Sequence, residues 1–174
     1  MKKNIILSVC LFTMQILRIL ISLFAAILVL IFVGSLVNDF PLQENLLEIQ
    51  SLVLNESGGL QLHELQTTNK WLLYVIIFQN LLTLTLLFSI LGYGIGIIRN
   101  IQRNKTFSKP TINAFDKVSQ LAIILFFVKF IKLSPIKVGI GFEFSYLFLA
   151  FGAIILTQVF KEGHRLLKEN ELTV

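Results

Sequence analysis

Cysteine and charge are both scarce in this chain, and each scarcity excludes a class of protein. Cys10 is the one cysteine among 174 residues, so no internal disulfide can form and no C-x-x-C or Cys/His metal spacing occurs. Charged residues make up 14% of the chain, against about a quarter in soluble proteins, whereas 55% of residues are hydrophobic. This apolar surplus exceeds what a soluble core can bury and predicts an integral membrane protein.

Sequence patterns of known catalytic sites are also missing. The chain has no serine nucleophile elbow, glycine-rich phosphate loop, zinc-protease helix or pair of intramembrane aspartates. His63 has no evident metal partners. We therefore expect no enzyme activity, no cofactor and no metal. The net charge of +5 is explained by topology and by attraction to anionic lipid, so direct binding of nucleic acid is not expected.

Four apolar runs approach the ~20 residues that a helix needs to cross a bilayer. These predicted spans are residues 19–37, 71–98, 118–133 and 142–160. A cleaved signal peptide is disfavoured, because the apolar stretch before Cys10 is too short, and residues 4–17 are expected to extend the first helix. The prediction is an all-α membrane protein, one domain over residues 1–174, folded as a four-transmembrane-helix bundle.

The distribution of lysine and arginine predicts the orientation of this bundle. Basic residues resist translocation, so the connections that hold most of them are expected in the cytoplasm. Eleven basic residues lie before the first span, between the second and third spans, and after the fourth; four lie elsewhere. Both termini are thus expected inside, with an external loop at 38–70, a cytoplasmic hairpin at 99–117 and a cytoplasmic helix at 161–174.

The segments expected outside the membrane have features of β structure. Residues 48–65 are partly alternating around an Asn-Glu-Ser-Gly-Gly turn, and residues 136–145 alternate apolar with polar or small side chains. Together they predict a small external β cap. Lys129 and Lys132 near the end of the third span can form an ion pair with Glu143 across the hairpin, which would lower the free-energy cost of charge near lipid.

Polar residues inside the spans are few. Gln79 and Asn80 lie in the second span, and Gln158 lies near the inner end of the fourth. They can line a substrate path, but uncharged amides more often form hydrogen bonds between helices, which is the interpretation we favour. Gly92 and Gly96 form a small-xxx-small pattern that allows close approach of two helices.

The segments expected in the cytoplasm hold the candidate docking residues. Ser108 can cap a helix whose first turn accepts Pro110, and Arg165 is spaced to pair with Glu162 and Glu169 on the last helix. These segments are either solvated helix ends or a surface that binds a partner. The candidate docking residues are Arg99, Arg103, Lys105, Phe107, Arg165, Leu166, Leu167 and Leu172.

These two segments also carry a family resemblance. The basic residues that lead to Phe107-Ser108, the stretch Phe160 to Gly163, and the tail Glu169 to Val174 resemble the bacterial membrane family filed as domain of unknown function 2975. The resemblance covers nearly the whole chain in number, order and length of the spans. It implies a four-helix bacterial inner-membrane protein without established activity, often encoded beside a small helix-turn-helix regulator of the Cro/CI type.

Three functional hypotheses follow. The leading one is a membrane-bound partner or antagonist of such a regulator, which binds it through the cytoplasmic hairpin and the last helix. The alternative is a small transporter, channel or export factor, which would act as an oligomer because four helices enclose little space. The third is a structural subunit of a larger membrane complex.

Overall fold

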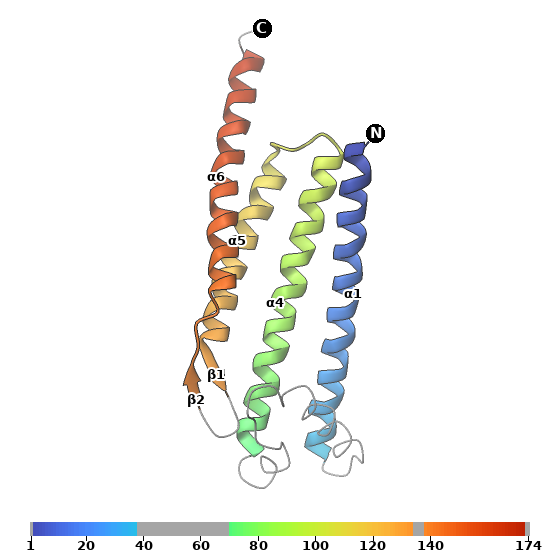
Figure 1. Cartoon of the computed structure of the whole chain (residues 1–174), viewed down its shortest axis with the longest axis vertical. Helices are drawn as coiled ribbons and strands as arrows, with labels where there is room; N and C mark the ends of the chain where they lie inside the picture. The colour runs from blue at the N-terminus through green and yellow to red at the C-terminus, as the bar shows by residue number, and fades with distance from the viewer. Residues whose placement is uncertain (1, 38–69, 134–137, 173–174) are drawn as a thin grey trace.

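The computed structural model describes residues 2–37, 70–133 and 138–172, and almost all of them are helical. In chain order the elements are α1 (Lys2–Val37), α4 (Lys70–Gln102), α5 (Lys109–Phe130), β1 (Ile131–Leu133), β2 (Val138–Ile140) and α6 (Phe144–Leu172) (Figure 1).

Each helix packs mainly against its neighbour in the chain. The main contacts are α1 with α4, α4 with α5, and α5 with α6, and successive helices run in opposite directions (Figure 1). The start of α1, the α4–α5 connection and the end of α6 therefore lie at one end of the bundle, here called the N-terminal end. The short strands lie at the other, the hairpin end. At the N-terminal end α6 extends beyond the other helices (Figure 1).

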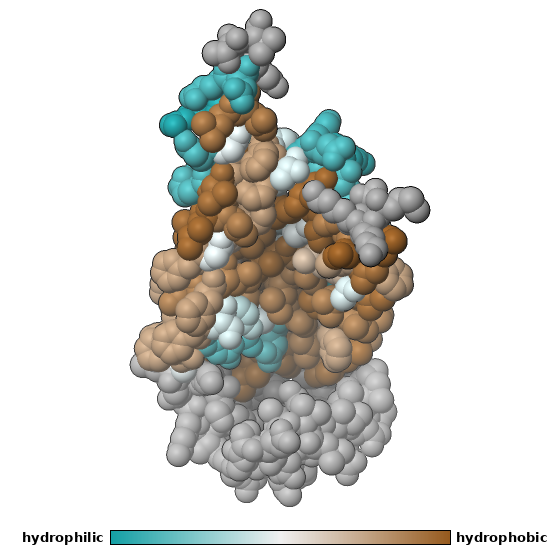
Figure 2. All heavy atoms as spheres, turned by 45° about the horizontal axis from the view of Figure 1, so that its top comes forward, coloured by the Kyte–Doolittle hydropathy of each residue, from teal (hydrophilic) through white to brown (hydrophobic). Residues whose placement is uncertain are grey.

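Four helices are long and apolar enough to cross a membrane, as the sequence predicted. Their apolar stretches are Ile5–Gly34, Tyr74–Gln102, Lys109–Phe130 and Phe144–Asn170. Many large hydrophobic side chains on α1, α4 and α6 are exposed, and the middle of the molecular surface is mostly hydrophobic (Figure 2). A soluble protein rarely exposes an apolar surface this continuous. The described residues thus have the features of a multi-pass membrane protein.

The first helix differs from the predicted span at its start. Helix α1 includes residues 4–17, as expected, and its apolar stretch begins at Ile5. Arg18, which the sequence placed just before a span at 19–37, therefore lies near the middle of this apolar stretch. The prediction began the span just after this charge, whereas the apolar stretch lies on both sides of it.

The third and fourth helices can be compared with their predicted spans. Helix α5 begins at Lys109, before the predicted span 118–133, as expected from Ser108 and Pro110, and it ends at Phe130, three residues before the end predicted for that span. At Ile131 the backbone becomes extended, with φ −89° and ψ 105°. Helix α6 begins at Phe144 rather than 142 and continues past residue 160 without a break, because Lys161 and its polar neighbours remain helical.

Strands β1 and β2 form an antiparallel pair with Ile131 opposite Ile140. Beyond the strands, the amide of Gly141 donates a hydrogen bond of 2.9 Å to the Phe130 carbonyl. One predicted strand is thus present at Val138–Ile140. The other segment predicted for the β cap, residues 48–65, lies outside the described residues, and the cap as a whole stays a prediction.

Small side chains make the α5–α6 interface close. On α6 the buried residues are Ala150, Ala153 and Thr157, whose spacing places them on one helix face. Ala122 and Leu125 of α5 are completely buried. Without a hydrophobic effect in lipid, helices associate by packing, and small residues allow that packing to be tight. This interface forms much of the described core.

Gln79 connects α4 with the end of α5. Its Nε2 donates hydrogen bonds to the carbonyls of Val128 and Ile131, at 2.6 and 2.7 Å. The last carbonyls of a helix have no partner within the helix and are costly to leave unpaired in apolar surroundings. Gln79 supplies those partners at the point where α5 becomes β1.

We predict that Gln79→Leu lowers the free energy of unfolding by about 1–2 kcal/mol, because two carbonyls lose their donor. Reversible unfolding in mixed detergent micelles measures this difference. The control is Gln158→Leu, since the Gln158 side chain is exposed on α6. Equal effects of the two substitutions would contradict the bridging role of Gln79.

Candidate functional site

Helix α4 ends in a compact hydrogen-bonded turn. The amide of Lys105 donates to the carbonyl of Asn100 at 2.9 Å, and the amide of Asn104 donates to that of Ile101 at 3.2 Å. Asn104 has φ 57°, a left-handed conformation that asparagine adopts more readily than most residues. These bonds form a Schellman motif, which satisfies helix-end carbonyls and turns the chain toward α5.

Helix α5 begins with a second set of polar contacts. Ser108 is the N-cap residue and Pro110 lies in the first turn, as the sequence predicted. The Ser108 hydroxyl does not bind a backbone amide and lies 3.0 Å from the hydroxyl of Thr111. Thr111 is completely buried, and its hydroxyl donates to the Lys105 carbonyl at 3.2 Å. The two hydroxyls thus tie the start of α5 to the end of the connection.

An aromatic cluster joins this connection to α6. The ring centroid of Phe160 lies 5.2 Å from that of Phe107 and 4.9 Å from that of Phe115. A Cβ at Gly163 would lie 2.6 Å from Cδ1 and Cε1 of Phe107, so the ring rests directly on the α6 backbone. We call Phe107, Phe115, Phe160 and Gly163 the aromatic clamp. Phe107 was a candidate docking residue, but its ring is half-buried in this clamp.

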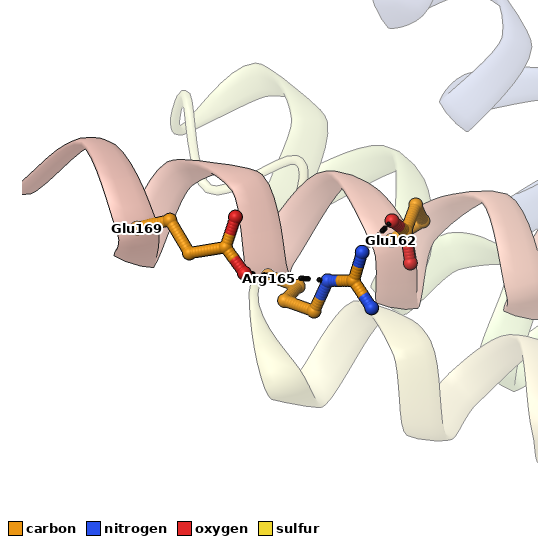
Figure 3. Close-up of polar contacts among 3 residues, drawn as sticks. All are labelled: Glu162, Arg165 and Glu169. Atoms are coloured by element: carbon orange, nitrogen blue, oxygen red, sulfur yellow. Dashed lines mark ion pairs between the residues drawn. The ribbon is translucent and has the colours of Figure 1, made fainter.

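Beyond the clamp, the projecting part of α6, residues 164–172, is a charged helix. Nη2 of Arg165 lies 2.6 Å from Oε1 of Glu162, and its Nε lies 3.5 Å from Oε1 of Glu169 (Figure 3). These are the contacts that the sequence spacing predicted. All three side chains are more than half exposed, so each pair contributes only a few tenths of a kcal/mol to helix stability. Their main effect is to hold Arg165 along the helix surface.

Two leucines are exposed on the same segment. Leu166 is 53% exposed and Leu167 is 50% exposed, among charged neighbours. The side chain of Leu172 lies outside the described part of the chain. Hydrophilic residues gather at this end of the molecule, along the projecting part of α6 and over the α4–α5 connection (Figure 2). The exposed basic candidates at this end are Arg99 in the last turn of α4 and Arg103 and Lys105 in the connection.

The intramembrane polar residues do not come together. Gln79 contacts the last turn of α5 at the hairpin end, and Asn80 is adjacent to it in α4. Gln158 is exposed on α6, two residues before Phe160, which belongs to the aromatic clamp at the N-terminal end. These three residues therefore form no continuous polar path through the bundle.

The candidate ion pair of Glu143 with Lys129 or Lys132 can be examined for Lys129 alone. No ion pair joins Lys129 to Glu143 in the part of the chain that the structure describes, and the side chain of Lys132 lies outside it. On the first turn of α6 the amide of Tyr146 donates a hydrogen bond of 3.3 Å to the carbonyl of Glu143. Among residues 2–37, 70–133 and 138–172, no group of three or more His, Cys, Asp and Glu could hold a metal ion.

Sequence reasoning gave no structural role to Gly163. The signal available was its position three residues after Phe160 in one of the two segments that carry the family resemblance. Contact between those segments makes a glycine necessary, since any side chain at residue 163 would overlap the Phe107 ring.

We predict that Gly163→Ala lowers the free energy of unfolding by about 1–3 kcal/mol, the range for overpacking a filled site. The matched control is Gly152→Ala in the same helix, where a Cβ would meet nothing within 4 Å. That control should be neutral or stabilising, by roughly 0.5–1 kcal/mol, because alanine favours helix more than glycine does.

Phe107→Leu should relieve part of the Gly163→Ala penalty, since the smaller side chain can move away from the new methyl group. Thermal unfolding in detergent compares the wild type, the three single variants and the double variant Phe107→Leu with Gly163→Ala. Additive effects of the two substitutions, or equal penalties at residues 152 and 163, would contradict the clamp.

Comparison with known proteins identifies one family. No curated protein and no solved structure matches the chain. Residues 59–174 match the model of a family described as "Protein of unknown function (DUF2975)". The match covers most of the chain and includes α4, α5 and α6 with every residue of the aromatic clamp. The chain belongs to the DUF2975 family.

Proposed function

We propose that this protein holds a small helix-turn-helix transcriptional regulator at the inner membrane of a bacterium, through the projecting part of α6 and the α4–α5 connection. One observation carries the proposal: α6 continues past the aromatic clamp as a helix with two exposed leucines. The partner class comes from the gene neighbourhood that the family resemblance implies.

The proposal requires the N-terminal end of the bundle to face the cytoplasm. The basic residues of the α4–α5 connection and of α6 after residue 160 lie at this end, together with Lys2 and Lys3 at the start of α1. Positive charge near the ends of spans favours the cytoplasmic side. A soluble partner in the cytoplasm would then reach the docking surface without crossing lipid.

The chemistry of the surface defines the complementary partner surface. An amphipathic helix binds by placing its apolar side chains in a hydrophobic groove. Burial of the exposed half of Leu166 and of Leu167 would supply about 1 kcal/mol each before the costs of association. Arg99, Arg103 and Lys105 would attract acidic residues at the rim of the groove and speed association. The expected partner surface is thus an apolar groove with an acidic rim.

While bound at the membrane, the regulator would be kept away from DNA. A change in the conformation of the membrane protein would release it. The aromatic clamp supports this role because it joins the docking helix to the transmembrane bundle, so that a movement of α5 against α6 would move the docking surface. The transport alternative gains no support, since Gln79 and Gln158 lie at opposite ends of the bundle.

We predict that Leu166→Ser combined with Leu167→Ser weakens binding of the neighbouring regulator at least ~10-fold, because the apolar anchors are lost. The measurement is binding of the purified regulator to the full-length protein in lipid nanodiscs. Lys168→Gln is the control, an exposed neighbour whose replacement removes no apolar surface. Unchanged binding by the leucine variant would contradict the proposed surface.

The orientation has its own test. We predict that in a Cys10→Ala background a membrane-impermeant thiol reagent labels Phe142→Cys on intact cells but not Lys168→Cys. Phe142 is exposed at the hairpin end, whereas Lys168 is exposed on the projecting part of α6. Labelling of both after the cells are opened is the control. Labelling of Lys168→Cys on intact cells would place the docking surface outside the cell.

A further inference from the structure

Arg18 is a charged residue in a position where charge is costly. It lies near the middle of the apolar stretch Ile5–Gly34 of α1. Gln102 at the end of α4 donates to the hydroxyl of Ser8, and Arg18 is ten residues further along α1, which is ~15 Å at ~1.5 Å per residue. Ionisable groups at such depth are rare and mark functional sites.

The protein compensates this charge only in part. The guanidinium carbon of Arg18 lies 4.1 Å from the ring centroid of Phe88, a cation–π contact. A ring face attracts the cation but accepts no conventional hydrogen bond. Nε of Arg18 is buried and has no hydrogen-bond partner among the described residues. A guanidinium has several N–H donors and no acceptor, so an unpaired one favours a bound oxyanion.

Two glycines leave space beside this guanidinium. A Cβ at Gly92 would lie 3.7 Å from Cζ of Arg18, and a Cβ at Gly96 would meet nothing within 4 Å. The small-xxx-small pattern suggested close approach of two helix backbones, but at these positions it makes room for Arg18 and for an adjacent pocket. This pocket has a volume of about 400 Å³ and lies between α1 and α4.

The residues that line the pocket carry positive charge only. Arg18 and Arg99 both line it, and the others are polar uncharged or apolar residues and the two glycines. Two guanidinium groups that share a pocket without a carboxylate repel each other. An anion bound between them would remove that repulsion and supply acceptors to both.

We propose that this pocket binds a phosphate group between Arg18 and Arg99, with the phosphate supplied by an anionic phospholipid. Guanidinium groups bind phosphate through paired hydrogen bonds. The pocket lies beside exposed apolar side chains of α1, including Ile16, Leu20 and Leu23, along which acyl chains can pack. In the orientation that the proposed function requires, the pocket lies toward the cytoplasmic side, where basic pockets between transmembrane helices suit anionic headgroups.

The test compares lipids and soluble phosphate on the full-length protein in lipid nanodiscs. Phosphatidylglycerol should raise the thermal unfolding midpoint relative to phosphatidylcholine alone, and native mass spectrometry should show it retained. Arg18→Gln should weaken phosphatidylglycerol binding ~10-fold or more, and Arg99→Gln should act in the same direction. Lys109→Gln, an exposed basic residue outside the pocket, should change binding less than ~2-fold.

A second arm separates the two sources of phosphate. Inorganic phosphate is titrated onto the protein in phosphatidylcholine nanodiscs. Stabilisation by inorganic phosphate that Arg18→Gln abolishes would support the phosphate site but overturn its assignment to lipid. Arg18→Lys keeps the positive charge but not the planar guanidinium, so its loss of phosphatidylglycerol binding should be intermediate. It also provides a folded variant if Arg18→Gln does not fold.

Two results would overturn the proposal. One is the absence of any preference for phosphatidylglycerol together with no effect of inorganic phosphate. The other is an equal loss of phosphatidylglycerol binding in Arg18→Gln and Lys109→Gln, which would indicate general attraction of anionic lipid to a basic surface.

Discussion

The Phe107 ring rests on the α6 backbone at Gly163, and the arrangement of the N-terminal end depends on that contact. The preceding turn, with Asn104 in a left-handed conformation, brings the ring to α6, and the buried hydroxyl of Thr111 fixes the start of α5 beside it. Helix α6 leaves the bundle just after the contact, so the clamp sets the direction of its projecting part. A docking surface on that part would therefore be coupled to helix packing within the bundle.

A second constraint is that polar groups in apolar surroundings need partners from the protein itself. Gln79 meets it at the end of α5, and Thr157 meets it by donating to the carbonyl of Ala153 in its own helix. Arg18 meets it incompletely, because Phe88 offers a ring face but no conventional acceptor for Nε. The unmet requirement at Arg18 is the physical reason to place an anion there.

Hydropathy alone predicted the number and order of the four helices that are long and apolar enough to cross a membrane, because each is a long apolar run. It could not predict where α5 ends, since Ile131 continues the apolar run but pairs with Ile140 in a strand, a contact that depends on residues further along the chain. It began the first span only after Arg18, because the groups that accommodate that charge belong to α4. Phe107 resembled an exposed docking residue for the same reason, since the glycine that receives its ring lies in α6.

The most direct test of the clamp is disulfide formation between Phe107→Cys and Gly163→Cys in a Cys10→Ala background, in native membranes. A Cβ at residue 163 would lie 3.2 Å from Cγ of Phe107, the atom that the sulfur of a cysteine at residue 107 replaces, so the two cysteines can approach within disulfide range. We expect rapid oxidation of this pair and none for Phe107→Cys with Gly152→Cys, three helical turns away. Failure of the first pair to oxidise, or equal oxidation of both, would contradict the clamped arrangement of the α4–α5 connection and α6.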